Sequence, residues 1–361
     1  MLIIRGAVKD YDWGIVDGLA PWAGVTSGEP QAELWFGVHP GGPSPLIDAS
    51  GELTGEHLAD HFDVTAIPVL VKLLAAARPL SVQVHPSHER AALLWAAQQS
   101  GKGPVVLSDP FEKTEMLVAL EPFEALAGWR STDQAAEIYE RVPGAAAVVT
   151  ALREREIPRA IREVLAIDPT RGAIAHLPDA VAAVIDDPGE LHGYATVAAL
   201  YPEDRGALLT PMLAYVSLSR GEALYLPAGV PHSYIRGVGL EVMSSSDNVL
   251  RLGLTGKPVF IEEALESLEW DRRPLVARAK IGDRIAPAGA PFAASLVTAG
   301  AATLPTGSFR IVLLIDGKGS ISTSLADVQL HPGTAAVLSA ADPDASISID
   351  GLAAVVTSED L

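Results

Sequence analysis

Cysteine is absent from all 361 residues of the chain. Disulfides and thiolate sites are therefore excluded, and the composition fits a reducing compartment, so we expect a cytoplasmic protein. The first residues, Met1 to Arg5, lack the charged segment and the long apolar core of a signal peptide. No hydrophobic run reaches the length that spans a membrane. Secretion and membrane insertion are therefore not expected.

Basic residues are scarce, with 26 Lys and Arg against 45 Asp and Glu and a net charge of −19. Nucleic acids and anionic membranes both require a basic face, so neither is an expected partner. An anionic small molecule would need a local cluster of basic side chains within this acidic chain. Hydrophobic residues make up 48% of the sequence, and the length allows two or three structural units around substantial cores.

One stretch, Leu80 to Pro86, alternates β-branched and polar residues. A strand repeats with a period of two, so Val82 and Val84 face one way, whereas Ser81, Gln83 and His85 face the other. Gln83 and His85 are both potential metal ligands on the same face. Taken alone, this pattern is also typical of a half-exposed strand whose polar face contacts water.

A second stretch, Gly221 to His232, indicates a turn, a strand, another turn and then a histidine. Its pattern P-x-G-x-x-H resembles the second half of the signature of cupins, small β-barrels that hold a metal ion in their mouth. The pair Gln83-x-His85 stands where the first half is expected. Glu115, just ahead of an apolar run, is the candidate fourth ligand. Two imidazoles, a carboxylate and an amide oxygen suit Zn²⁺ or another divalent transition metal.

Several further motifs occur in the order found in one family of zinc enzymes within the cupin superfamily. They are Tyr11–Gly14, Ala32–Gly37 with His39-Pro40, the Gln83/His85 strand, Lys113 with Glu115, Pro227–Tyr234, and Glu241–Thr255. With these motifs, which lie in residues 1–130 and 200–260, the sequence resembles the type I mannose-6-phosphate isomerases. One departure is Asp109–Glu115, where the family usually ends in Asn-His-Lys-Pro-Glu; here the lysine and the glutamate are kept, but not the histidine and the proline.

The resemblance implies a mainly β fold with a helical insertion, built as two cupin-like (jelly-roll) β-barrels plus an α-helical domain. Residues 1–130 and 211–270 would form a discontinuous catalytic barrel, and residues 131–210 the helical insertion. Residues 271–361 would form a degenerate cupin-like barrel without a metal. Within this scheme the pattern of residues predicts short helices at 51–62, after Ser87, after a cap at residues 131–133 with Ile138 and Val142 on its apolar face, and at 145–152, 157–167 and 181–185.

The family resemblance also implies the reaction, the zinc-dependent interconversion of mannose 6-phosphate and fructose 6-phosphate through an enediolate. One zinc ion per chain would be bound by Gln83, His85, Glu115 and His232. The expected partner is thus a small sugar phosphate, and we expect a monomer. A zinc ion suits such proton transfer because it polarises a carbonyl and offsets the negative charge that develops.

Other residues near these motifs are candidates for catalysis and substrate binding. We expect Arg251, Glu241, Lys113 and Tyr234 to be catalytic, and Ser81, Lys257 and Arg251 to bind the substrate and its phosphate. Glu241 is the favoured base and Arg251 the group that stabilises the enediolate. Two alternatives stay open at this level: Lys257 could be a solvated loop lysine, and Glu241 could do no more than pair with Arg251.

Two other functions compete with the isomerase. An Fe²⁺ oxygenase of the cupin class would favour two histidines and a carboxylate next to an apolar pocket, whereas this chain has a glutamine ligand and nearby basic residues. A non-catalytic sugar-binding cupin would have no need of a Lewis acid, whereas this chain keeps every candidate ligand. Both differences favour the isomerase.

Overall fold

The long strand β14 (His232–Ser244) runs through the largest of three sheets in the computed structural model, which describes residues 1–359. It pairs with β8 along one edge and with β10 and β11 along the other, all antiparallel. The other strands of this 11-stranded sheet are β2 (Ala7–Lys9), β5 (Glu33–Phe36), β8 (Val69–Ala76), β9 (Val82–Val84), β10 (Glu115–Ala119), β11 (Phe123–Trp129), β12 (Leu213–Leu218), β13 (Ala223–Leu226), β15 (Leu250–Gly253) and β16 (Leu275–Ala277). A two-stranded ribbon of β3 (Ile15–Val16) and β4 (Pro30–Gln31) completes this part.

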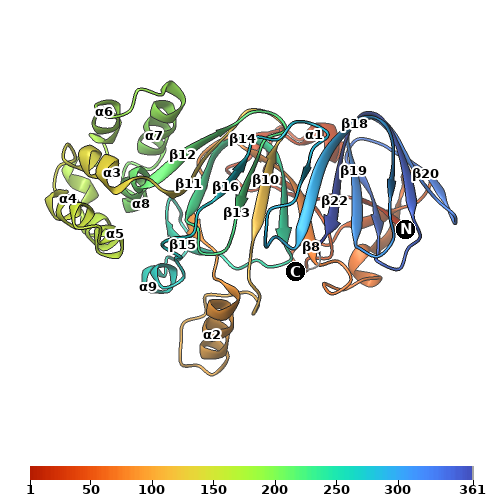
Figure 1. Ribbon diagram of the computed structural model, residues 1–361, viewed down its shortest axis with the longest axis horizontal. Coiled ribbons are helices and arrows are strands. Elements are labelled where there is room, and N and C mark those ends of the chain that lie inside the picture. Colours follow the sequence, from red (N-terminus) through yellow and green to blue (C-terminus); the bar gives the residue numbers. More distant parts are fainter. Residues whose placement is uncertain (360–361) are drawn as a thin grey trace.

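A second, nine-stranded sheet contains most of the C-terminal residues (Figure 1). Its strands are β17 (Arg284–Ile285), β18 (Phe292–Leu304), β19 (Arg310–Thr323), β20 (Asp327–Leu330), β21 (Thr334–Leu338), β22 (Ala345–Ser358), β1 (Leu2–Arg5), β6 (Pro45–Ile47) and β7 (Leu53–His57). The strand pairing corrects the predicted division in one respect: β1, β6 and β7 come from the first 60 residues but belong to this sheet, because β1 pairs with β21. The other predicted domain boundaries stay a prediction.

The prediction of a mainly β chain with a helical insertion is confirmed, since six helices lie between β11 and β12 (Figure 1). They are α3 (Thr132–Tyr139), α4 (Ala146–Arg153), α5 (Ile157–Ala166), α6 (Leu177–Ala182), α7 (Pro188–Leu200) and α8 (Arg205–Leu209), with short 3₁₀ turns at Pro169–Arg171 and Thr210–Met212. Of these, α7 and α8 were not predicted, and α6 begins four residues before the predicted segment. In neither sheet does the strand order of residues 1–359 close into a ring, so the two closed barrels stay a prediction.

Three further helices lie outside this insertion, α1 (Ala20–Ala23), α2 (His88–Gln99) and α9 (Ile261–Leu265). The predicted helix α2 begins after Ser87, whose hydroxyl accepts a hydrogen bond from Arg90 N. The helix predicted at 51–62 is wrong, because this segment forms β7 and a 3₁₀ turn, Leu58–Asp60. None of the helices in residues 1–359 is long and apolar enough to cross a bilayer.

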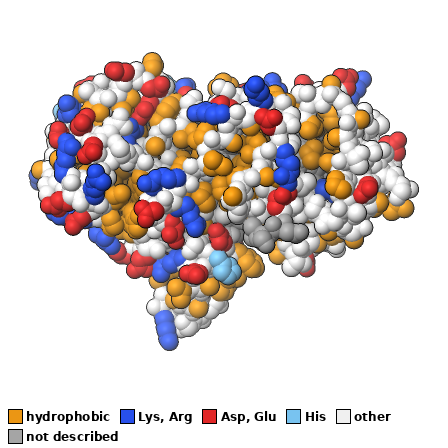
Figure 2. Space-filling view, viewed as in Figure 1, with side chains coloured by type: hydrophobic (Ala, Val, Ile, Leu, Met, Phe, Trp, Pro, Cys, Tyr) orange, Lys and Arg blue, Asp and Glu red, His pale blue; other side chains and the backbone are white. Residues whose placement is uncertain are grey.

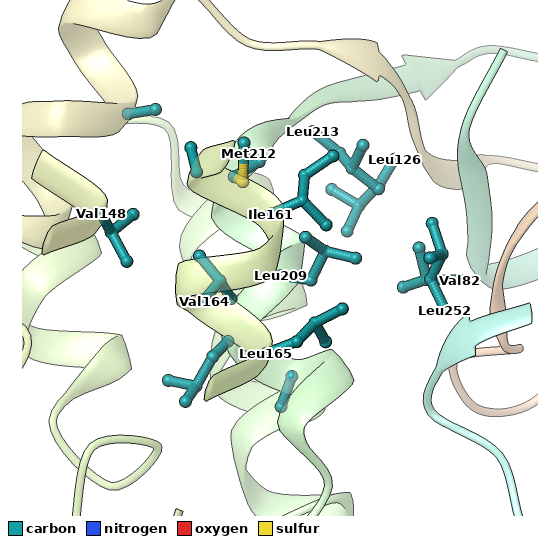
Figure 3. Packing of buried hydrophobic residues seen from close by; sticks show 14 of the residues in the cluster. Val82, Leu126, Val148, Ile161, Val164, Leu165, Leu209, Met212, Leu213 and Leu252 are labelled. Atoms are coloured by element: carbon teal, nitrogen blue, oxygen red, sulfur yellow. The ribbon is translucent and has the colours of Figure 1, made fainter. Parts of the chain in front are cut away.

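The helical insertion shares its core with the strands that carry the polar motifs. Figure 3 shows Ile161 and Leu209 of the helices facing Val82 of β9 and Leu252 of β15 across one apolar layer. All four side chains are buried. Because a strand alternates its faces, packing Val82 and Leu252 against the helices directs the neighbouring Gln83 and Arg251 to the opposite side.

Acidic and basic side chains are interspersed over the helices in the space-filling view of Figure 2. Exposed ion pairs explain part of this pattern, as between Arg153 and Glu140 and between Arg162 and Glu262. Such exposed pairs contribute little to stability, because water screens them and both side chains lose freedom. These exposed pairs therefore do not by themselves mark a functional site.

Candidate metal centre and active site

Three buried side chains from different strands converge on one point. Glu115 begins β10, His232 begins β14, and His85 follows β9. His85 Nε2 lies 3.1 Å from Glu115 Oε2, and His232 Nε2 lies 2.9 Å from Glu115 Oε1. Their candidate ligand atoms all lie within 4.8 Å of one another. The structure thus brings together three of the four predicted metal ligands, although 147 positions separate the two histidines in the sequence.

Backbone carbonyls orient both imidazole rings. The Nδ1 atom of His85 donates to Asn248 O at 2.8 Å, and that of His232 donates to Val230 O at 2.9 Å. A carbonyl can only accept, so in the neutral ring the proton sits on Nδ1 and the Nε2 lone pair faces Glu115. Two lone pairs and a carboxylate that face one another repel. A cation between them would remove this repulsion, so the donor set fits a divalent metal ion.

Gln83, the fourth predicted ligand, lies beside this cluster. It pairs with His232 on one side and with Arg251 on the other, and directly paired residues of a sheet share a face. Its Nε2 lies 3.1 Å from His232 Nε2, and its Oε1 accepts a hydrogen bond from Ser81 Oγ at 3.1 Å. Rotating the terminal amide by half a turn would direct Oε1 at the cluster, with Ser81 then accepting from Nε2.

Lys113 and Tyr234 both contact the carboxylate of Glu115. Lys113 Nζ lies 3.1 Å from Oε2, and Tyr234 donates to Oε1 at 3.2 Å. Burial raises the pKa of Glu115, but Lys113 and the two histidines oppose this strongly enough to hold the pKa well below its usual range. The carboxylate is therefore ionised at neutral pH, as a metal ligand must be.

Burial and the charge of Lys113 lower the pKa of His85 to about 4. In the unfolded chain the ring takes up a proton near its ordinary value of 6.5, so between pH 6.5 and 4 the unfolded state binds more protons than the folded state. We expect the unfolding free energy of the metal-free chain to fall by up to about 3 kcal/mol as the pH drops through this window. Urea titrations at several pH values would measure the slope.

The matched variant for this pH effect is His85→Gln. Its unfolding free energy should lose the part of the pH dependence that His85 contributes. His88→Gln is the control, because His88 is exposed at the start of α2. An unchanged slope in His85→Gln would contradict the assignment of this proton uptake to His85.

A row of side chains on paired strands crosses the sheet next to the metal cluster. Glu241 of β14 pairs with Lys72 of β8, which pairs with Trp35 of β5. Lys72 Nζ lies 3.0 Å from Glu241 Oε2 and 3.6 Å from Glu33 Oε1, and Trp35 Nε1 donates to Glu33 at 2.7 Å. The alternative in which Glu241 only pairs with Arg251 is wrong, because the ion pair of Glu241 is with Lys72.

The protonation of Glu241 is finely balanced in this row. Burial raises its pKa and Glu115 adds to the effect, whereas Lys72 lowers it; the net direction is upward. Burial and the two carboxylates Glu115 and Glu241 hold the pKa of Tyr234 well above its usual range. Of the two predicted proton carriers, Glu241 is thus the one whose pKa moves towards neutral pH, and Tyr234 stays protonated there.

Glu115 of the metal cluster and the side chains of this row line one cleft of about 640 Å³. Every predicted site residue except the metal-ligand candidates His85 and His232 lines it, namely Ser81, Gln83, Lys113, Glu115, Tyr234, Glu241, Arg251 and Lys257. Arg251 points into the cleft while Leu250 and Leu252 are buried among the helices, as the alternation predicted. Lys257 lies at the rim, exposed, with Nζ 5.7 Å from the ring centroid of Tyr11.

Two residues of the site were missed by the sequence analysis. Asn248 holds the ring of His85 through its backbone carbonyl, and its side chain accepts from Ser108 N and donates to Phe111 O. Its position within the motif Glu241–Thr255 was the signal in the sequence that could have identified it. Arg78 lines the cleft and forms an ion pair with Asp12; its nearness to Ser81 and Gln83 in the sequence could have drawn attention to it.

Comparison with known proteins decides the family. Residues 1–132 match the model of the phosphomannose isomerase type I catalytic domain. The chain is 30% identical over 381 aligned residues to the mannose-6-phosphate isomerase of Escherichia coli K12, covering 96% of both chains. It is also 30% identical to mannose-6-phosphate isomerase 1 of Arabidopsis thaliana, covering 74% of this chain and 70% of that one. The chain belongs to the type I mannose-6-phosphate isomerase family.

Solved structures of this family share the whole fold. A crystal structure of mannose 6-phosphate isomerase bound with zinc and yttrium has a TM-score of 0.85 and 28% identity, and a mutant of the Salmonella typhimurium phosphomannose isomerase has a TM-score of 0.86 and 28% identity. Both comparisons cover 100% of both chains. The segment that matches the family model, residues 1–132, contains Gln83, His85 and Glu115. His232 and Arg251 lie in the part of the chain that only the full-length relatives cover.

The departure from the family motif at 109–115 leaves the metal cluster intact. Glu112, in place of the usual histidine, accepts a hydrogen bond from His88 N at 3.0 Å and so ties this loop to the start of α2. Thr114, in place of the usual proline, donates its backbone N–H to Ser244 Oγ at 3.1 Å, a bond that a proline could not make. In this family member, hydrogen bonds therefore hold the segment that presents Lys113 and Glu115.

Proposed function

We propose that this chain is a zinc-dependent aldose–ketose isomerase that interconverts mannose 6-phosphate and fructose 6-phosphate. The observation that carries the proposal is the convergence of the buried His85, Glu115 and His232, of which Glu115 lines a cleft together with a buried acid and several basic residues. Family membership supports the same reaction, because relatives that align over almost the whole chain are mannose-6-phosphate isomerases.

The metal would be one zinc ion per chain, held by His85, Glu115, His232 and the amide oxygen of Gln83. Bound there, zinc would supply Lewis-acid polarisation of the substrate carbonyl and partial neutralisation of the enediolate. Lys113 and Tyr234 contribute to this centre by contacting Glu115, which keeps that carboxylate ionised and oriented. These two are thus proposed as positioning residues that also line the cleft.

Glu241 is the proposed base that moves a proton between C1 and C2 of the sugar. It reaches the cleft, is buried, and has a pKa raised towards neutral pH, which suits a group that must both take and return a proton. Lys72 holds one oxygen of this carboxylate at 3.0 Å and so fixes its position. A fixed carboxylate loses little freedom when the substrate arrives, which favours transfer between adjacent carbons.

Arg251 is the proposed donor to the enediolate oxygens. Its Cα is paired with that of Gln83 across β15 and β9, so its guanidinium starts from the strand next to the one that carries Gln83. Lys257 and Ser81 are the proposed contacts of the phosphate and of a sugar hydroxyl. All three side chains line the same cleft.

The composition of the cleft favours this function over a cupin oxygenase. Five basic and five acidic side chains line it, which suits a polar sugar phosphate and not an apolar substrate. The partner is thus proposed to be a small sugar phosphate bound by a monomeric cytoplasmic chain, with no nucleic acid or membrane involved.

The test combines metal content and product formation on one preparation. The purified chain should contain one zinc per chain by elemental analysis and should form fructose 6-phosphate from mannose 6-phosphate in a coupled assay. A chelator should abolish turnover and added zinc should restore it. A zinc-loaded chain that forms no fructose 6-phosphate would overturn the proposed reaction, and full activity without bound metal would overturn the proposed cofactor.

A further inference from the structure

The basic side chains of the cleft differ in how much of their charge is already neutralised. Lys72 lies between Glu33 and Glu241, and Lys113 contacts Glu115. Both are buried together with their partners. The charges of these two lysines are therefore already neutralised by carboxylates that the site itself requires. A phosphate dianion has to be met by the three remaining basic residues of the cleft, Arg78, Arg251 and Lys257.

Arg78 differs from the other two by having an acidic partner that is almost entirely in water. It forms an ion pair with Asp12, whose side chain is 86% exposed, against 36% for that of Arg78. An ion pair with such an exposed carboxylate contributes little net free energy, because water stabilises the separated carboxylate nearly as well. The guanidinium of Arg78 can therefore exchange Asp12 for another anion at small cost.

Hydrogen bonds hold the backbone around Arg78 in place. Ala76 bridges to Gly14, and Ala77 N donates to Trp13 O at 2.9 Å, which ties this segment to the loop that carries Asp12. On the other side, Tyr201 donates its hydroxyl to Pro79 O at 2.7 Å. The side chain thus projects into the cleft from a fixed position.

A second basic residue lies at the same end of the cleft. The Nζ atom of Lys257 lies 5.7 Å from the ring centroid of Tyr11, the residue before Asp12, and Tyr11 stacks on Trp13. Arg78 precedes Gln83 by five positions, which allows at most about 17 Å between their Cα atoms. This upper limit is compatible with one hexose 6-phosphate that reaches from the metal ligands, at C1 and C2, to Arg78, at the C6 phosphate.

We propose that Arg78 is a phosphate-binding residue of this active site and that Asp12 is its internal competitor. This proposal rests on the proposed function, since it assigns the phosphate end of the same cleft. When the substrate enters, two N–H groups of the guanidinium bind two phosphate oxygens, and Asp12 turns into water. Between turnovers, Asp12 thereby keeps the side chain of Arg78 extended. It also weakens the binding of singly charged anions to Arg78, because they displace Asp12 from the guanidinium less well than a phosphate dianion does.

The test separates substrate binding from turnover in the zinc-loaded enzyme. For Arg78→Ala we expect the KM for mannose 6-phosphate to rise by at least about tenfold, because a charged two-point contact is lost, with kcat changed by less than about threefold. The dissociation constant of inorganic phosphate, measured by calorimetry, should rise by a similar factor. Arg78→Lys should have a KM and a phosphate dissociation constant between those of the wild type and Arg78→Ala, because lysine keeps the charge but lacks the planar guanidinium.

For Asp12→Asn we expect the opposite change, a KM and a phosphate dissociation constant lowered by about two- to fivefold. This gain should vanish in the double variant with Arg78→Ala, because Asp12 acts only through Arg78. The control is Arg236→Ala, an exposed arginine paired with Glu124 that does not line the cleft, and it should leave both constants unchanged.

Unchanged KM and phosphate affinity in Arg78→Ala would overturn the proposal, and so would an Asp12→Asn gain that persists without Arg78. The phosphate titration does not depend on turnover. If the wild-type chain bound inorganic phosphate but formed no fructose 6-phosphate, the proposed reaction would fail while the titrations of the variants would still decide the role of Arg78.

Discussion

His85→Ala should lose its zinc and at least about a thousandfold of its turnover. His85 is one of three buried ligands, and its removal leaves Glu115 and His232 with an incomplete set. A metal ion that polarises the carbonyl and offsets the enediolate charge is worth several kcal/mol in the transition state, which corresponds to about a thousandfold in rate. Zinc content by elemental analysis and kcat by the coupled assay measure the two losses together.

His88→Ala is the matched control for this substitution. His88 lies three residues away, in the first turn of α2, and is exposed. This variant should keep one zinc per chain and normal turnover. If His85→Ala instead retained stoichiometric zinc with near-normal turnover, the assignment of the metal centre would be wrong.

Arg251→Ala should fold, keep its zinc and lose about a hundredfold in kcat. The guanidinium lies in the cleft beside Gln83, where it can meet charge that grows as the enediolate forms. Its contribution is then larger in the transition state than in the bound substrate, and removing one preorganised donor of this kind typically costs about a hundredfold or more. Arg251→Lys should recover little, because lysine lacks the planar fork.

The kinetic pattern of Arg251→Ala distinguishes two roles for the residue. A rise in KM alone, with kcat intact, would make Arg251 a phosphate-binding residue like the proposed Arg78 and would refute its catalytic role. Arg278→Ala serves as the control, because Arg278 is exposed, pairs with Glu222 and does not line the cleft. It should change neither kcat nor KM.

The strand alternation at residues 80–86 shows how far a local pattern reaches. It predicted that Gln83 and His85 share a face opposite Val82 and Val84, and the structure has both valines in the core with the helices. The same argument placed Arg251 in the cleft. These predictions succeeded because the direction of a side chain on a strand depends on neighbours one and two positions away.

Local patterns failed where strand pairing decides the structure. Residues 51–62 were predicted as a helix, but Leu53–His57 pairs with β6, the strand just before it in the chain, and so joins the second sheet. The strand β1 likewise lies between β6 and β21, more than 300 residues apart from the latter in the sequence. Neither partner can be identified from the composition of the segment itself, because packing against neighbouring strands in the sheet overrides weak local preferences.

By itself, the sequence determined the polar and apolar faces of the site strands and, through its ordered motifs, the family and the candidate metal ligands. Only the tertiary structure decided how the charges of the cleft are shared: Lys72 is committed to Glu33 and Glu241, Lys113 to Glu115, and Arg78 only to the exposed Asp12. The physical reason is that the strength of a charge depends on its burial and on partners brought close by folding, and neither is encoded in the spacing of residues along the chain.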